Sequence, residues 1–261
     1  MSKRRRTWNQ ATYERYLKEG QGCGSGADYK PWIRVQDFAS QGMVSRVKGR
    51  TTGRVHHLLS NNELAYFYLL DWSDSITDIR EQYPLSDLDC VIAVAAQAGI
   101  KYPTDNISGY PYIMTCDFMI ATTSGAKART IKMTKELENP RTLEKLEIER
   151  RYWAIQGVDW RIVTEHEISR QKAKNIEWLY TSNGFSVAGL NEYELEHICF
   201  ALLALLNLGD YSIVDAVALV ECEFMLPAGT GLQLFKRLAY EKKIAVDLSR
   251  PINLNVKGVA A

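Results

Sequence analysis

Thr115-Cys-Asp-Phe-Met-Ile-Ala121 and Thr130-Ile-Lys-Met-Thr134 are two short, largely apolar stretches, and Ser124-Gly125 lies between them. Short apolar runs bounded by turn residues are typical of two strands joined in a hairpin. Side chains alternate between the two faces of a strand. In the first strand we therefore expect one face to carry Cys116, Phe118 and Ile120, and the other to carry Thr115, Asp117 and Met119.

The pairing of these strands brings an acid and a lysine together. If Ser124-Gly125 is a two-residue turn, Asp117 lies directly opposite Lys132, on the same face of the sheet. In metal-dependent nucleases a carboxylate in this position binds Mg²⁺, and the ammonium stabilises the charge that develops on the phosphate. The pattern alone also fits an ordinary cross-strand ion pair, which is worth about 0.2–1 kcal/mol.

A second acid, Glu63, follows a helix-start signal. Ser60-Asn-Asn-Glu63 precedes an apolar segment and matches a capping box, so a helix is expected to begin here. Glu63 would share a helix face with Phe67 and Leu70, which are residue types of the core. Its carboxylate is therefore either a cap alone, or a cap held against the sheet where a hard metal ion shares it.

The remaining segments predict a mixed sheet flanked by helices. An amphipathic helix is indicated over Arg141–Gln156. Further strands are expected at Ile76–Tyr83 and Trp160–Thr164, and further helices at Leu88–Ala98 and Lys172–Tyr180. Residues 1–55 show little periodicity, and the glycines between residues 20 and 26 predict loop rather than helix.

The chain after residue 180 has a different character. A Ser/Asn/Gly-rich stretch at Thr181–Gly189 indicates a linker. Helical patterns then cover Glu192–Leu206, Ile213–Glu221 and Gly231–Lys242, followed by a strand at Lys243–Leu248 and a return at Pro251–Val256. Three helices followed by a β-ribbon are typical of a winged helix.

Composition narrows the class of protein. The 261 residues are 46% hydrophobic and 24% charged, which is the globular norm and excludes global disorder. No apolar run approaches the roughly 20 residues that a membrane helix needs. The N-terminus lacks the apolar stretch of a secretory signal, and the five cysteines contain no CxxC, so we expect a cytoplasmic protein without a zinc-finger or disulfide framework. The adjacent pair His56-His57 is a poor zinc site, because neighbouring side chains point apart.

Positive charge is concentrated near the N-terminus. Residues 1–60 contain 12 Lys or Arg against 4 Asp or Glu, whereas residues 185–261 contain 6 against 9. Such a basic segment indicates a polyanion partner, with nucleic acid first, although a solvated basic tail fits as well. The candidate phosphate contacts are Lys3, Arg4, Arg5, Arg6, Arg46, Lys48, Arg50 and Arg54. Phosphate contacts position a protein without reading sequence, so we expect the isolated chain to bind DNA weakly and in a salt-sensitive manner.

Several longer blocks carry a resemblance to a known family. They are Thr52-Gly-Arg-Val-His-His-Leu-Leu-Ser60 with Glu63-Leu-Ala65, Asp78-Ile-Arg-Glu-Gln82, Arg141-Thr-Leu-Glu-Lys-Leu-Glu147 and Asn175-Ile-Glu-Trp-Leu-Tyr180. In their order and spacing these blocks resemble the TnsA endonuclease family, the 5′-end-cleaving subunit of the heteromeric transposase of Tn7-like elements. The resemblance runs from about Lys18 to Tyr180.

The resemblance implies a fold and a set of site residues. It implies a restriction-endonuclease-like catalytic domain over residues 56–182, preceded by a basic N-terminal segment at 1–55 and followed by a winged-helix-like domain at 187–261. Glu63, Asp117 and Lys132 take the three catalytic positions. Glu63 and Asp117 would hold Mg²⁺, for which Mn²⁺ substitutes, together with the carbonyl of Ile131. Thr130 stands where nucleases of this fold often have an acid, and a hydroxyl is a poorer ligand than a carboxylate.

The resemblance also implies a reaction and partners. The chain would hydrolyse one phosphodiester at each transposon 5′ end, while a DDE-type transposase cuts and joins the 3′ ends. Its C-terminal domain would bind the AAA+ regulator ATPase of the transposon. Two alternatives remain open: a stand-alone restriction or repair nuclease of the same fold, and a non-catalytic scaffold that links transposase and ATPase.

Overall fold

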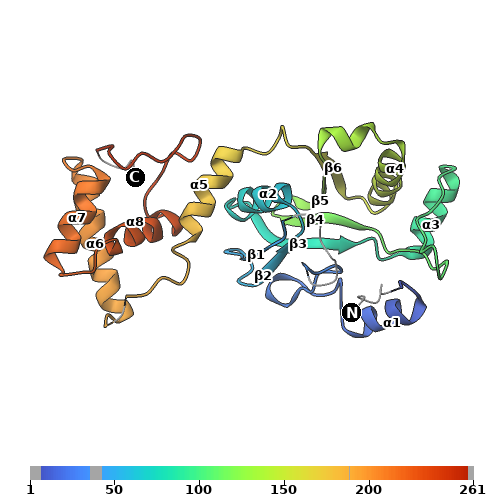
Figure 1. Cartoon of the computed structure of the whole chain (residues 1–261), viewed down its shortest axis with the longest axis horizontal. Coiled ribbons are helices and arrows are strands. Elements are labelled where there is room, and N and C mark those ends of the chain that lie inside the picture. Colours follow the sequence, from blue (N-terminus) through green and yellow to red (C-terminus); the bar gives the residue numbers. More distant parts are fainter. Residues whose placement is uncertain (1–6, 36–42, 188, 258–261) are drawn as a thin grey trace, which may run out of the picture. The chain divides into compact units, whose positions relative to one another are not determined.

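The computed structural model describes residues 7–35, 43–187 and 189–257. The chain divides into two structural units, Met1–Ile168 and Ser169–Ala261 (Figure 1). This division lies before helix α5 (Arg170–Tyr180), whereas we placed α5 in the catalytic domain and the boundary after residue 182. Each unit is described separately below.

The first unit contains a mixed four-stranded sheet with the order β3-β4-β5-β6. The strands are β3 (Ile76–Pro84), β4 (Thr115–Thr122), β5 (Gly125–Ile131) and β6 (Asp159–Val163). The β3–β4 and β4–β5 pairs are antiparallel, whereas β5 and β6 are parallel. The parallel step is possible because η3 (Thr134–Glu138) and α4 (Pro140–Ile155) form the crossover between these two strands. The predicted mixed sheet with flanking helices is confirmed.

Both faces of the sheet are covered. On one face, α3 (Leu88–Gln97) and α4 contribute Val91, Val94, Ile148 and Tyr152 to a buried apolar cluster. On the other, Tyr66 of α2 (Asn61–Asp71) lies against Phe118, with ring centroids 5.8 Å apart.

The strict alternation that we predicted along β4 does not hold. Cys116 and Met119 belong to the same apolar cluster, whereas Phe118 contacts α2. The irregularity coincides with Gln82 on the neighbouring strand, which has a φ of 48° although it is not a glycine. Its neighbours Glu81 and Tyr83 still pair with Phe118 and Cys116, so the left-handed residue does not shift the register of the two strands.

The register of the β4–β5 hairpin also differs from the prediction. Thr122 pairs with Gly125 and Phe118 with Arg129, so the turn residues are Thr123 and Ser124. The second strand begins at Gly125 and ends at Ile131, not at residues 130–134. Lys132 therefore lies just beyond the strand, two residues further along than the position opposite Asp117. A two-residue shift leaves side chains on the same face, which is why Asp117 and Lys132 still approach each other.

Residues before the sheet are more ordered than predicted. Helix α1 (Gln10–Lys18) forms where we expected loop, with Asn9 as its N-cap. The helix is stabilised by tertiary packing, which the periodicity of its own sequence does not reveal. The centroid of the Trp8 ring lies 5.5 Å from that of Tyr16 and 6.2 Å from that of Trp32. The short turn η1 (Gly26–Asp28) follows, and β1 (Ser45–Lys48) then pairs with β2 (Val55–Leu58) in a separate two-stranded sheet.

The second unit is helical. It contains α5, α6 (Glu192–Leu208), α7 (Ile213–Glu223) and α8 (Thr230–Tyr240), close to the predicted bounds. The predicted strand at Lys243–Leu248 does not form, and between residues 243 and 257 the structure shows only an isolated bridge from Ser212 to Lys257. Asn175 binds this segment instead, because its amide donates to the carbonyls of Leu248 and Arg250 at 2.9 and 2.6 Å. Within the described ranges, no helix of either unit has the length and apolarity to cross a membrane.

Candidate active site

Glu63 is fixed at the start of α2, where Ser60 is the N-cap, as predicted, although the reciprocal bond of a capping box from the Ser60 N–H does not form. Its backbone N–H donates to the Ser60 hydroxyl at 3.1 Å, and that hydroxyl donates to the Glu63 carboxylate at 2.9 Å. The other carboxylate oxygen accepts from the backbone N–H of Leu59 at 3.0 Å. Glu63 is only 7% exposed. The cap therefore holds a buried carboxylate in one orientation instead of leaving it in solvent.

Gln82 connects this carboxylate to the sheet, and our sequence analysis did not identify it. Its amide donates to the Glu63 carboxylate at 3.1 Å, and its side chain also hydrogen-bonds Asp117. Gln82 is 3% exposed and occupies the left-handed φ noted above. Backbone strain at a non-glycine residue often marks a functional site. Here the strained residue joins the two predicted metal ligands.

Asp117 and Lys132 meet at the end of β4. The Ile131 N–H donates to the Asp117 carboxylate at 2.5 Å, and the Lys132 ammonium lies 3.8 Å from the same oxygen. The ammonium also donates to the Ile131 carbonyl at 2.9 Å. Because the side chains of Asp117 and Lys132 are 15% and 29% exposed, this end of the site is open to a ligand. The structure thus brings the three predicted residues Glu63, Asp117 and Lys132 together.

The electrostatics of the site favour a cation. Burial, followed by the negative charge of Asp117, raises the pKa of Glu63 to about 7. Burial also raises the pKa of Asp117, although Lys132, the Ile131 N–H and Gln82 oppose the shift. For Lys132, burial lowers the pKa, but the surrounding carboxylates outweigh it and the net shift is upward. Two acids that share one neutral amide and one partly exposed ammonium retain excess negative charge once deprotonated.

This donor set fits Mg²⁺. The ion commonly keeps several waters and needs only one or two protein carboxylates, which Glu63 and Asp117 provide. Among the described residues, no group of three or more His, Cys, Asp or Glu side chains forms a metal cage. The fit is therefore to a hydrated, oxygen-liganded ion and not to a structural zinc.

Comparison with known proteins agrees with this chemistry. Residues 73–165 match the family described as "TnsA-like endonuclease N terminal", and residues 167–248 match "TnsA endonuclease C terminal". Transposon Tn7 transposition protein TnsA of Escherichia coli is 36% identical over 258 residues, which cover 98% of this chain and 92% of that protein. The chain belongs to the TnsA endonuclease family. The first family match includes Gln82, Asp117 and Lys132, and it ends three residues before the boundary between the two structural units.

A third buried acid lies next to the site in this TnsA family member. Glu149 of α4 is 3% exposed, and it accepts hydrogen bonds from the Thr130 hydroxyl and, at 3.0 Å, from the Trp160 indole. Burial raises its pKa to about 7. Sequence analysis did not identify Glu149, although a signal was present: it lies three residues after Leu146 and four before Trp153, on the apolar face of the helix.

Thr130, whose hydroxyl is a poorer metal ligand than a carboxylate, has another role in this arrangement. Its side chain is buried, at 2% exposure, and its hydroxyl donates to Glu149. Thr130 of β5 is thus linked to an acid supplied by α4. This contact places a third carboxylate next to the strand that carries Ile131 and leads to Lys132.

The predicted DNA-contacting residues have different environments. Arg46 and Lys48 are exposed on β1. Arg50 lies 3.6 Å from Asp74, and Arg54 forms a buried ion pair with Glu81. Lys3, Arg4, Arg5 and Arg6 lie outside the described residues.

In the neighbouring pair His56-His57, both ring nitrogens of His56 are engaged by protein groups. His56 is fully buried, between the Thr52 hydroxyl at 2.7 Å from Nε2 and the Glu81 carboxylate at 2.8 Å from Nδ1. Although hydroxyl, imidazole and carboxylate follow one another as in a hydrolytic triad, Thr52 is 7% exposed and cannot readily meet a substrate. The array instead ties β2 to β3.

Proposed function

We propose that this chain is a metal-dependent DNA endonuclease that hydrolyses a phosphodiester at the 5′ ends of a Tn7-like transposon. The observation that carries the proposal is the pair of buried carboxylates, Glu63 and Asp117, joined through Gln82 with the Lys132 ammonium 3.8 Å from Asp117. Family membership and a relative named as a transposition protein support the transposon as the source of the DNA. Such an enzyme would act in the cytoplasm, at the nucleoid.

The chain's own residues suit this reaction. Glu63 and Asp117, with the Ile131 carbonyl, would hold Mg²⁺, for which Mn²⁺ substitutes. When bound, the ion lowers the pKa of a water molecule and offsets negative charge on the phosphate. The Ile131 N–H fixes the orientation of the Asp117 carboxylate, and the Lys132 ammonium stabilises the charge that develops on the phosphoryl oxygens.

The decisive experiment scores the two strands separately. The full chain is combined with the DDE-type transposase of the same element, transposon-end DNA labelled on each strand, and Mg²⁺. Asp117→Asn is expected to abolish 5′ cleavage and to leave 3′ cleavage intact. Asp89→Asn, an exposed acid on α3, serves as the matched control. Wild-type 5′ cleavage by Asp117→Asn would refute the proposal, and efficient cleavage of plain DNA without the transposase would favour a stand-alone nuclease.

We propose further that the second unit binds the AAA+ regulator ATPase of the transposon. Helix α6 carries apolar side chains that its own unit leaves in solvent: Tyr193 is 82% exposed, Phe200 70% and Leu208 65%. They follow each other at intervals of seven and eight residues, so they share one face of the helix. Tyr193→Ser with Phe200→Ser in the full chain should abolish co-purification with the ATPase without changing DNA binding. Undiminished co-purification would exclude this face as the contact.

A further inference from the structure

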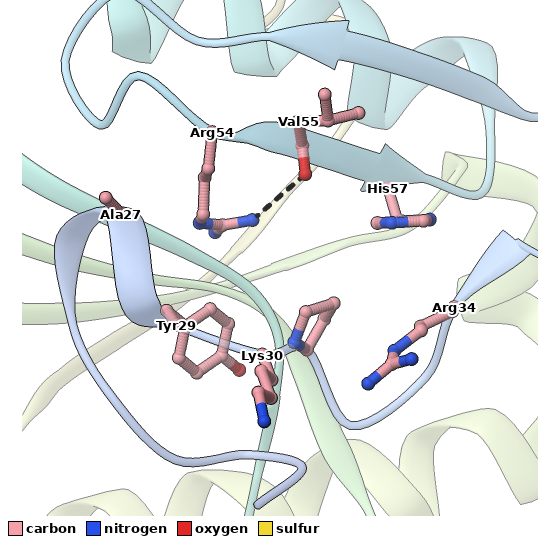
Figure 2. Close-up of a pocket in the computed structure, with 8 residues that line it drawn as sticks. Ala27, Tyr29, Lys30, Arg34, Arg54, Val55 and His57 are labelled. Atoms are coloured by element: carbon pink, nitrogen blue, oxygen red, sulfur yellow. Dashed lines mark hydrogen bonds between the residues drawn. The ribbon is translucent and has the colours of Figure 1, made fainter.

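A basic pocket lies between the segment that follows η1 and the beginning of β2. It has a volume of about 240 Å³ and is lined by Ala27, Tyr29, Lys30, Pro31, Arg34, Arg54, Val55 and His57 (Figure 2). A water molecule takes about 30 Å³ of liquid volume, so the pocket has room for a phosphate group with waters around it. Among the described lining residues there are three permanent cations and no acid.

The wall of the pocket is rigid where Arg54 forms it. The Arg54 side chain is 8% exposed and its guanidinium is paired with the buried Glu81 carboxylate. The guanidinium also lies over the Tyr29 ring, 5.1 Å from the centroid, and the Tyr29 hydroxyl donates to the Glu81 carbonyl at 3.1 Å. Since Glu81 neutralises Arg54, the charge that can attract a bound anion comes first from Lys30, and Arg34 adds a second guanidinium to the lining.

Two lining groups can donate to an anion. The Lys30 ammonium donates to the Glu19 carbonyl at 3.0 Å, and within the part of the chain that the structure describes no carboxylate is paired with it. The backbone N–H of Val35 donates to Nδ1 of His57 at 3.5 Å, so the neutral ring carries its proton on Nε2. Nε2–H is then a hydrogen-bond donor in a pocket where Lys30 and Arg34 supply positive charge.

The electrostatic environment of His57 is consistent with an anion site. Burial lowers the pKa of His57, Glu81 opposes this shift, and Arg46, Arg34 and Arg54 lower the pKa further. Three guanidinium groups therefore act on one imidazole that faces the pocket. A bound anion would offset their field and raise the pKa of His57, which is a measurable consequence.

Both walls of the pocket are attached to the active site. His57 precedes Leu59 by two residues, and the Leu59 N–H bonds the Glu63 carboxylate at 3.0 Å, so the His57 backbone lies within about 10 Å of that carboxylate. On the other wall, the Trp32 N–H donates to the Gln82 carbonyl at 3.2 Å.

We propose that the pocket formed by Lys30, Arg34 and His57 binds a backbone phosphate of the DNA, within a few nucleotides of the bond that is cut. Guanidinium and ammonium groups that converge with an N–H donor suit a phosphate, whose oxygens accept several charge-assisted hydrogen bonds. The inference rests on the proposed function, because it assigns the substrate of the same site a second point of attachment. This contact sets which phosphodiester reaches Glu63 and Asp117.

The first test measures DNA affinity against salt. The full chain carrying Lys30→Gln and Arg34→Gln is titrated with a labelled transposon-end duplex over a range of salt concentrations. Each lost phosphate contact reduces the slope of log K on log salt by about 0.9, and the pocket is proposed to hold one phosphate, so the double variant is expected to lose about 0.9. Lys101→Gln, an exposed lysine of the same unit outside the pocket, should keep the wild-type slope. Lys30→Arg should also keep it, because it restores the charge.

A second test does not depend on cleavage. The imidazole signals of His57 are followed by NMR while inorganic phosphate is added. The wild-type chain should show an increase in the pKa of His57, and Arg34→Gln should show a smaller increase or none. A urea unfolding curve for each variant confirms that it is folded.

The outcomes separate this inference from the proposed function. A double variant with the wild-type slope and affinity, or with normal DNA binding but weakened capture of the transposase, would overturn the pocket as a phosphate site. If the inference holds, the double variant needs more DNA than the wild type to reach half of its maximal rate, and its cuts spread to phosphodiesters next to the wild-type position. Failure of the proposed function would be detected in the strand-specific cleavage experiment, where Asp117→Asn would retain 5′ cleavage.

Discussion

Two neighbouring residues of β3, Glu81 and Gln82, belong to buried polar clusters with opposite electrostatics. The Glu81 carboxylate is fully buried and is held by Arg54 and His56, which outweigh burial and lower its pKa to about 2. Gln82 instead bridges the acids Glu63 and Asp117, whose pKa values are both raised by burial. One cluster is balanced by a cation from the chain, and the other retains room for a cation from solution.

The difference shows how a buried acid can be interpreted from its partners. A buried carboxylate that meets an arginine in a closed ion pair acts as a structural tie, and here it joins β2 to β3. Carboxylates whose donors are neutral except for one partly exposed ammonium keep a free-energy cost of charge burial, which a divalent ion would relieve. The same strand therefore carries a structural tie at Glu81 and a functional bridge at Gln82.

The largest expected effect is on stability. Glu81→Gln leaves the buried Arg54 without its partner, and breaking a buried ion pair typically costs about 3–5 kcal/mol. Urea unfolding should show this loss in the free energy of unfolding. Glu147→Gln is the matched control: Arg150 and Arg151 also lower the pKa of Glu147 to about 2, but these pairs are largely exposed and should cost less than about 1 kcal/mol. Equal losses in the two variants would remove the distinction between the clusters.

The next effect is on the rate of cleavage. Lys132→Ala removes the ammonium beside Asp117, and losing one group that stabilises transition-state charge typically lowers the rate about 10²–10³-fold. The free energy of unfolding should change little, because the Lys132 side chain is 29% exposed. Strand-specific cleavage in the reconstituted reaction measures the rate, with Lys101→Ala as the control. A rate within a few-fold of wild type would assign Lys132 to the structure and not to the chemistry.

Local signals in the sequence predicted most of the helices and the proximity of Asp117 to Lys132, whereas the choice of Glu63, Asp117 and Lys132 as the site residues came from the family resemblance. The helix start at Ser60 and the proximity of Asp117 to Lys132 both follow from short-range patterns, and both are present, although the Glu63 carboxylate accepts from the Leu59 N–H and not from the Ser60 N–H that a capping box uses. The register was wrong by two residues, because the glycine that we placed inside the turn is the first residue of β5. Turn geometry is decided by backbone dihedral angles that composition only suggests.

Gln82 and Glu149 could not be found in this way, because their roles depend on contacts between distant segments. Gln82 acts through a left-handed backbone conformation in the middle of a strand, which strand patterns do not predict. Helix α1 was missed for a related reason, since Trp8 and Trp32 stabilise it from outside its own sequence. The predicted strand at Lys243–Leu248 does not form, and Asn175, which lies 73 residues before Leu248, instead donates to the carbonyls of Leu248 and Arg250.

A smaller effect separates the clusters by pH. Glu81 has a lowered pKa, so its contribution to stability is complete above the unfolded value of about 4.5 and is lost as the pH falls towards about 2. Glu63 has a raised pKa, so the folded state loses stability as the pH rises from about 4.5 through about 7. Because Mg²⁺ binds the deprotonated form, its affinity should increase by up to about tenfold per pH unit below about pH 7.

Calorimetric titration of the full chain with Mg²⁺ at several pH values measures this affinity. Asp117→Asn is expected to bind Mg²⁺ more weakly, and the increase in affinity with pH should be smaller, because its amide neither titrates nor carries charge. A wild-type affinity that is independent of pH would contradict the shared burial of Glu63 and Asp117 as the source of their raised pKa values.

The smallest expected effect concerns Glu149. Its surroundings are intermediate between those of Glu81, which is paired with a cation, and those of Glu63 and Asp117. Its hydrogen-bond donors, Thr130 and Trp160, are neutral, so burial raises its pKa to about 7 and the charged form costs stability at higher pH. Glu149→Gln keeps an oxygen for both donors and removes that charge. Above about pH 7 the variant should match or exceed the wild-type free energy of unfolding by about 1 kcal/mol, and the difference should shrink towards pH 5. Thermal unfolding across this range tests it without Mg²⁺. If Glu149→Gln is instead destabilised most at high pH, the Glu149 carboxylate is compensated in the folded protein, and it belongs with Glu81 as a structural tie.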